Sequence, residues 1–153
     1  MQVLKTILHP TDLSDLALNA FHAAHALARD HRARLILLYV HQPQEVVEGE
    51  FGMPPPEDEP SDEEMLARLR AMVPAGSLVQ AEAAVAHGNA AEAIVAVARE
   101  LNCDVIVMGT HGRKGVARWF HGSVADAVTR TAPCPVLALR SSQTESAVVP
   151  ARA

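Results

Sequence analysis

The sequence predicts a single α/β domain with three layers, in which helices cover both faces of a five-stranded, doubly wound parallel sheet. Hydrophobic residues make up 49% of the 153 residues but aromatic residues only 3%, so Ala, Val, Leu and Ile must form the core. Short apolar runs typical of strands alternate with stretches of helical periodicity, an order that requires parallel strands joined by right-handed crossovers. The length suits one hydrophobic core.

Five apolar runs predict the strands. The run Val3–His9 ends before Pro10, which cannot donate a hydrogen bond to a sheet. The run Leu78–Ala86 alternates more than the others, as expected of a strand at the edge of a sheet. The remaining strands are predicted at Arg34–Val40, Asp104–Met108 and Pro135–Leu139.

Four stretches of helical periodicity predict the helices. They cover residues 16–31, 62–73 and 90–101, and a segment that follows Ser123. Residues able to cap a helix precede each stretch, and two of them are followed three positions later by Glu. The capping candidates are Asp12 or Ser14, Ser61 with Glu64, Asn89 with Glu92, and Ser123.

Residues 42–60 form an acidic, proline-rich segment with three consecutive prolines from Pro54, a composition too polar and too stiff for the core. Nine of the 18 acidic residues lie between Glu45 and Glu64, where there is no Lys or Arg. The rest of the chain is therefore mildly basic. We expect an exposed loop. The net charge of -5 gives no general attraction to nucleic acid or to an anionic membrane.

Other features argue against a membrane, disulfide or metal protein. No stretch approaches the roughly 20 apolar residues of a membrane span, and no signal peptide is evident, so we expect a cytoplasmic location. Cys103 and Cys134 lack the spacing of a metal or redox motif and are expected to be ordinary thiols.

The eight histidines do not show the tight local spacing of a zinc site. Only His22 and His25 are close in sequence, and they have no companion ligand, so we assign no metal ligand. A more economical hypothesis is that His111 or His121 lies beside a bound phosphate and makes its affinity depend on pH. The histidines near predicted strand ends or in the glycine loop are His9, His41, His87, His111 and His121.

A glycine loop follows the strand that ends at Met108, and it reads GTHGRKGVARWFHGS. Gly109, Gly112, Gly122 and Ser123 obey the pattern G-x2-G-x9-G-S. In a doubly wound sheet the ligand site lies beyond the carboxyl ends of the strands, where the strand order reverses. The first two glycines permit a tight turn and a close approach to a ligand, and the last two residues open a helix whose free amides face an anion.

The loop carries Arg113, Lys114 and Arg118 and no acidic residue, which favours a phosphate group as the ligand. The alternative is that the glycines only form turns and that Ser123 only caps a helix. Four positions at fixed spacing on the ligand edge of a sheet favour phosphate binding.

The G-x2-G-x9-G-S pattern is the nucleotide signature of the ATP-binding branch of the universal stress protein family, which this chain resembles. The similarity covers residues 1–140 and includes the segments PTD, HGNAAEAI, DVIVMGTHG and PCPVL. The resemblance implies an adenine nucleotide alpha hydrolase-like sheet with strand order 3-2-1-4-5. It also implies a nucleotide-binding domain over residues 1–141, and we expect a flexible tail over residues 142–153.

The resemblance further implies the roles of individual residues. Asp12 would contact ribose or adenine, although it is equally well explained as a helix cap. Val40 would line the adenine pocket, and Val124 would offer a backbone amide beside Ser123. The nucleotide-binding candidates are Pro10, Thr11, Asp12, Val40, Met108, Gly109, Gly112, Arg113, Gly122, Ser123 and Val124.

The chain lacks the P-loop pattern G-x4-G-K-[ST], and no catalytic triad or carboxylate pair can be assigned by motif. We therefore favour binding of ATP, ADP or another adenine nucleotide, together with Mg²⁺, with at most slow hydrolysis. The expected function is that of a nucleotide-regulated, dimeric signalling or protective module in the stress response. A nucleotide-independent dimeric scaffold and a slow ATP-hydrolysing enzyme are the alternatives. The resemblance implies that the strand Val136–Leu139 pairs with its copy in a homodimer, and a further protein partner stays unidentified.

Overall fold

The structure is a computed structural model that describes residues 3–43, 59–110 and 122–140. Its five strands form one parallel sheet in the order β3-β2-β1-β4-β5, which confirms the predicted class and strand order. The strands are β1 (Thr6–Pro10), β2 (Arg34–His41), β3 (Ala81–His87), β4 (Val105–Thr110) and β5 (Val136–Arg140).

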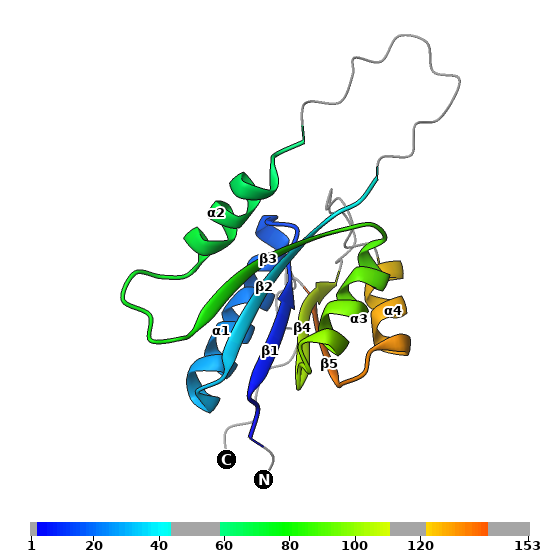
Figure 1. The fold of residues 1–153 in the computed structure, drawn as a ribbon. Coiled ribbons are helices and arrows are strands. Elements are labelled where there is room, and N and C mark those ends of the chain that lie inside the picture. The colour runs from blue at the N-terminus through cyan, green and yellow to red at the C-terminus, as the bar shows by residue number, and fades with distance from the viewer. Residues whose placement is uncertain (1–2, 44–58, 111–121, 141–153) are drawn as a thin grey trace, which may run out of the picture.

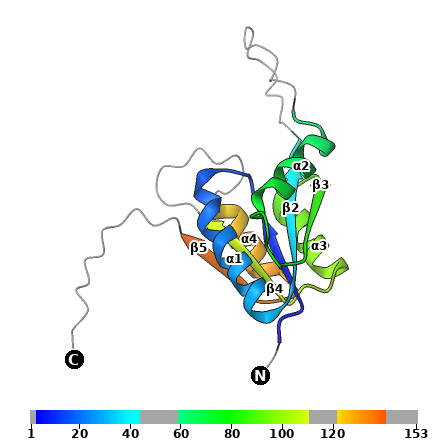
Figure 2. The ribbon, with the colours of Figure 1, turned by 90° about the vertical axis from the view of Figure 1, so that its left-hand side faces the viewer.

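Helices cover both faces of the sheet. Figure 1 shows α1 and α2 on one side and α3 and α4 on the other, and Figure 2 views the molecule from the side of α1 and α2. No described helix is long and apolar enough to cross a membrane. A short 3-10 helix, η1 (Asp15–Ala17), precedes α1 (Leu18–His31), and the other helices are α2 (Asp62–Met72), α3 (Ala90–Glu100) and α4 (Gly122–Thr131).

The core is aliphatic, as the composition predicts. Ile7 and Leu8 in β1 and Ile106 in β4 are fully buried, and β2 is buried along nearly its whole length. These central strands are covered on both faces, which explains their unbroken apolar sequence. β3 lies at one edge of the sheet, as predicted, and is only half-buried.

Two predicted caps are confirmed. The hydroxyl of Ser61 accepts a hydrogen bond from the amide of Glu64, whose carboxylate accepts from the amide of Ser61 in return. The side-chain oxygen of Asn89 accepts from the amide of Glu92 at the start of α3. Both caps satisfy amides that a helix would otherwise leave without a partner.

The prediction that Asp12 or Ser14 caps the first helix is wrong. α1 begins only at Leu18, and Ala17 occupies its N-cap position without a side-chain hydrogen bond. The 3-10 turn lies between, and Asp12 instead bonds the amide of Ser14 within the turn after β1. A short acidic side chain can satisfy an amide two residues on as readily as a helix terminus.

Candidate functional site

The carboxyl ends of β2, β1 and β4 lie side by side at one edge of the sheet. β1 is the point where the strand order reverses, because β2 lies on one side of it and β4 on the other. Pairing of β1 with β2 runs as far as Pro10 opposite Leu38, whereas pairing with β4 ends at Leu8 opposite Ile106. The ladder between β1 and β4 therefore ends early at the position where doubly wound folds bind ligands.

Pro10 explains why that ladder ends. Successive amides along a strand face opposite neighbours, and the amide of Thr11 donates to the carbonyl of Leu38 in β2. The nitrogen of Pro10 therefore faces β4, but it has no hydrogen to donate. The carbonyl of Val107 accepts instead from Nδ1 of His9, at 2.8 Å.

The His9 side chain is a neutral, buried link between β1 and β4. It has no exposed surface, and burial lowers its pKa from 6.5 to about 4, an effect that the bond to the Val107 carbonyl partly offsets. Nδ1 therefore carries the hydrogen, and Nε2 is a buried acceptor without a hydrogen bond among the described residues. This geometry gives His9 a structural role beneath the candidate site.

The turn after β1 brings several side-chain oxygens together. The hydroxyl of Thr11, which is fully buried, accepts from the amide of Leu13 at 3.1 Å. Oδ1 of Asp12 accepts from the amide of Ser14 at 2.9 Å. Leu13 has a φ of 64°, in the left-handed region that leucine seldom adopts, so these two bonds hold a strained backbone.

Two oxygens in this turn are buried and lack a hydrogen bond among the described residues. They are Oδ2 of Asp12 and Oγ of Ser14. An unpaired buried polar atom costs free energy, and such atoms concentrate at functional sites. A donor such as a sugar hydroxyl would satisfy the carboxylate oxygen of Asp12.

Two of the apolar candidates lie on the strands that flank β1. Val40 near the end of β2 and Met108 in β4 have no exposed surface. Gly109 lies inside β4, which runs two residues further than the prediction, and Thr110 at its end donates from its hydroxyl to the carbonyl of Leu139. The strand continues because β5 supplies partners as far as Thr110 opposite Arg140.

The start of α4 faces the same edge, because a helix that connects parallel strands runs back from the carboxyl end of the first. α4 begins at Gly122, so Ser123 is its second residue and the prediction that Ser123 caps the helix is wrong. Ser123 is exposed and Val124 is half-buried, and their amides belong to the first turn of the helix. The predicted residues Gly112 and Arg113 lie outside the described residues.

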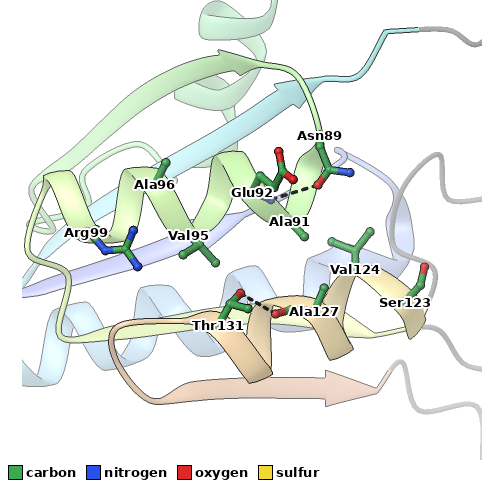
Figure 3. A pocket seen from close by; sticks show the side chains of 10 residues that line it. All are labelled: Asn89, Ala91, Glu92, Val95, Ala96, Arg99, Ser123, Val124, Ala127 and Thr131. Carbon is green, nitrogen blue, oxygen red and sulfur yellow. Dashed lines mark hydrogen bonds between the residues drawn. The ribbon is translucent and has the colours of Figure 1, made fainter.

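A groove of about 640 Å³ runs between α3 and α4. Figure 3 shows the N-terminal ends of both helices at one end of it, with Asn89 and Ser123, and Arg99 and Thr131 towards the other end. Its middle is formed by small apolar side chains. None of the candidates from β1, β2 and β4 lines this groove, which shares only Ser123 and Val124 with the predicted site.

The remaining histidines and cysteines show no metal chemistry in the described part of the chain. No group of three or more His, Cys, Asp or Glu side chains there is arranged to hold a metal ion. His25 lies 2.8 Å from the hydroxyl of Ser77, and His22 is exposed. Cys103 and Cys134 are free thiols, and burial raises the pKa of Cys103 to about 11.

Comparisons with known proteins agree with this fold. The sequence profile of the Universal stress protein family matches residues 4–140. A universal stress protein of Thermus aquaticus is 37% identical over 147 residues, which cover 90% of this chain and all of that protein. A universal stress protein of Methanocaldococcus jannaschii is 32% identical over 145 residues, covering 92% of this chain and 85% of that protein.

A solved structure of a universal stress protein in complex with cAMP is also similar. It superposes with a TM-score of 0.68 at 25% sequence identity, and the match covers 92% of this chain and all of the other. The profile match covers most of the chain, and the fold agrees with it. The chain therefore belongs to the universal stress protein family.

Proposed function

We propose that this universal stress protein binds an adenine nucleotide, ATP in the first instance, at the carboxyl ends of β1, β2 and β4. The observation that carries the proposal is the turn after β1, where the carboxylate of Asp12 keeps one buried oxygen without a hydrogen bond among the described residues. A carboxylate that follows a strand near the switch point is a suitable acceptor for a ribose hydroxyl.

The surroundings of Asp12 fit the other parts of a nucleotide. Val40 and Met108 are buried apolar side chains on the two strands that flank β1, and they suit the face of an adenine ring. The first turn of α4 offers free amides near Ser123, where phosphate groups bind well. In the sequence, the basic loop with Gly112 and Arg113 joins these two halves. Mg²⁺ would accompany the phosphates.

The relative that was solved with cAMP supports an adenine nucleotide as the ligand class. This chain has the same fold as that protein. Because no P-loop lysine or catalytic motif is evident, we propose binding with at most slow hydrolysis, as in a switch whose state depends on the nucleotide.

We further propose that two copies associate through β5. This strand pairs with β4 on one side only, which leaves its other edge unpaired among the described residues. Leu137 in β5 is 39% exposed, which is unusual for a leucine in the sheet of this protein. Pairing with a second copy would satisfy the strand edge and cover that side chain.

Calorimetry with nucleotide-stripped protein, ATP and Mg²⁺ tests the nucleotide site. We expect micromolar binding by the wild-type chain and loss of binding by the Gly122→Val, Ser123→Ala double variant, with its fold checked by circular dichroism. Thr131→Ala is the matched control, because it removes a hydroxyl from the opposite end of the same helix, where Thr131 donates to the carbonyl of Ala127.

Each result of the calorimetry has a definite meaning. Absence of ATP binding by the wild-type chain would refute the proposal and favour a nucleotide-independent scaffold. Equal loss of affinity in Thr131→Ala would show that the effect comes from damage to α4 and not from the phosphate contacts. Titration with cAMP in place of ATP distinguishes a preference for a cyclic monophosphate from a preference for the triphosphate.

A further inference from the structure

Ser14 occupies the position of a helix cap, but its side chain does not act as one. The residue precedes η1 with φ −73° and ψ 159°, the extended backbone that N-cap residues adopt. Its carbonyl accepts a hydrogen bond from the amide of Ala17 at 3.0 Å, whereas its hydroxyl makes no cap hydrogen bond to the described amides of η1. The hydroxyl is therefore not engaged in the usual role of a serine at this position.

The hydroxyl of Ser14 is nevertheless buried. The residue as a whole is half-buried, but Oγ has almost no exposed surface and no hydrogen-bond partner among the described residues. A hydroxyl can donate one hydrogen bond and accept two, so an unpaired hydroxyl costs free energy when it is removed from water. Buried polar atoms without a partner are rare in folded proteins, and each calls for a structural or functional reason.

Asp12 places a second such atom on the same turn. The amide of Ser14 donates to Oδ1 of Asp12 at 2.9 Å, which ties the two residues together. The other carboxylate oxygen, Oδ2, is buried and has no partner within the described part of the chain, Oγ of Ser14 included. The turn therefore holds a carboxylate oxygen and a hydroxyl, two residues apart, at the carboxyl end of β1.

The backbone between these two residues is strained. Leu13 has a φ of 64°, which leucine seldom adopts, and its amide donates to the buried hydroxyl of Thr11 at 3.1 Å. Strained backbone persists where the surrounding contacts fix it, and it is concentrated at ligand sites. The strain favours a binding role for the residues on either side of Leu13 over a merely connecting role.

The chemistry of the two unpaired atoms matches one part of a nucleotide. A carboxylate oxygen only accepts hydrogen bonds, whereas a hydroxyl both donates and accepts. The ribose of a ribonucleotide carries two neighbouring hydroxyls, so one of them can donate to Asp12 while the other exchanges a hydrogen bond with Ser14. A 2′-deoxyribose, or a ribose closed by a 3′,5′-cyclic phosphate, offers only one free hydroxyl to this pair of atoms.

We propose that Ser14 is a specificity-determining residue of the nucleotide site, where its hydroxyl binds one ribose hydroxyl beside the contact to Asp12. This role rests on the proposed function, and it gives a ligand contact to a residue that the sequence suggests only as a helix cap. The ligand class is a ribonucleotide with both ribose hydroxyls free, such as ATP. A site whose buried polar groups are left unpaired discriminates against an analogue that lacks the matching hydroxyl.

Calorimetry with ATP, 2′-deoxy-ATP and 3′-deoxy-ATP tests this role in the wild-type chain and in Ser14→Ala. We expect Ser14→Ala to bind ATP about fivefold more weakly, because one hydrogen bond is lost. Each deoxynucleotide should bind the wild-type chain more weakly than ATP does. One of the two lacks the hydroxyl that Ser14 contacts, and its affinity should be nearly the same in both proteins, because that contact is already absent.

Thermal unfolding without nucleotide tests the unpaired hydroxyl separately from the proposed function. Ser14→Ala should not lower the melting temperature, because the substitution removes no side-chain hydrogen bond among the described residues. Ser77→Ala is the matched control, because the hydroxyl of Ser77 lies 2.8 Å from Nε2 of His25 and accepts from the amide of Val79 at 3.2 Å. That variant should have a lower melting temperature and should bind ATP like the wild-type chain.

The possible results distinguish a failure of this role from a failure of the proposed function. Absence of ATP binding by the wild-type chain would exclude both. Unchanged ATP affinity in Ser14→Ala, or an equal loss of affinity for all three nucleotides, would overturn the role of Ser14 and leave the nucleotide site in place. A melting temperature that falls as far in Ser14→Ala as in Ser77→Ala would show that the hydroxyl supports the fold, and it would also overturn the role.

Discussion

The two carboxylate oxygens of Asp12 differ in their contacts. Oδ1 accepts a hydrogen bond from the amide of Ser14 at 2.9 Å, whereas Oδ2 is buried without a hydrogen bond among the described residues. The first oxygen maintains the turn after β1, in which Leu13 takes a left-handed conformation. The second oxygen is the one that the proposed contact to a ribose hydroxyl would use. Structural and binding effects at Asp12 can therefore be separated by choosing the substitution.

Asp12→Asn should retain the turn and lose nucleotide affinity. An asparagine carbonyl can still accept from the amide of Ser14, but its NH₂ group cannot accept a hydrogen bond from a ribose hydroxyl. We expect a loss of roughly tenfold or more in affinity, because hydrogen bonds to charged groups contribute about 1.5–3 kcal/mol. Calorimetry with ATP measures the affinity, and thermal unfolding of the same samples should show little change.

Asp12→Ala is the complementary variant, because it removes both oxygens. It should lower the melting temperature as well as the affinity, since the strained turn at Leu13 loses one of its two supporting bonds. If Asp12→Asn binds ATP as tightly as the wild-type chain, Asp12 has no role in the site and acts only in the turn.

Burial of His9 should make the protein less stable in acid. The folded-state pKa of His9 is about 4 and its ordinary value is 6.5, so between these values the unfolded chain binds a proton that the folded chain does not. The contribution of neutral His9 to the free energy of unfolding is fully present above about pH 6.5, and it is lost as the pH falls towards 4. The loss amounts to about 3 kcal/mol, which follows from the difference between the two pKa values.

Urea denaturation at a series of pH values between these limits measures the effect. His9→Gln keeps a donor for the carbonyl of Val107 but cannot titrate, so its free energy of unfolding should vary less with pH than that of the wild-type chain. His22→Gln, at an exposed position on α1, is the control and should follow the wild-type curve. Parallel curves for wild type and His9→Gln would show that His9 is not the group responsible.

Most of the fold could be predicted from local patterns in the sequence. The apolar runs in β1, β2 and β4 and the capping residues Ser61 and Asn89 are direct consequences of burial and of unpaired helix amides, so each is visible without the structure. The strand order came from the family resemblance, because periodicity does not specify which strands are neighbours. Element ends were shifted by a few residues where a partner strand extended the ladder, as at Thr110.

The site was predictable only in part, because its details depend on residues that meet across the sheet. The sequence identifies Asp12 but assigns it equally to a helix cap, and only the structure shows the 3-10 turn that separates it from α1. The role of His9 depends on the ladder position that Pro10 leaves without a donor. Ser14 is recognisable in the sequence only as a possible helix cap, because the burial of its hydroxyl depends on how the turn folds.

Asp104 should stabilise the start of β1. Its Oδ2 accepts from the amides of Lys5 and Thr6 at 2.8 and 2.9 Å, and so joins the chain before β4 to the amino end of β1. Asp104→Ala should lower the free energy of unfolding by about 2 kcal/mol, because two amides lose a charged acceptor. Chemical denaturation at neutral pH measures this loss, and Asp104→Asn, which retains one acceptor oxygen, should lose less. Equal losses in the two variants would exclude the hydrogen bonds as the cause.

Leu137 should control the association of two copies if β5 forms the dimer interface. Leu137→Glu places a charge on the exposed face of this edge strand, where it would be desolvated by a partner, so we expect the variant to sediment as a monomer at micromolar concentration. Leu78→Glu is the matched control, because Leu78 is 99% exposed and precedes β3 at the opposite edge of the sheet. That variant should sediment like the wild-type chain, which we expect to be a dimer. A monomeric wild-type chain, or a dimer that persists in Leu137→Glu, would contradict association through β5.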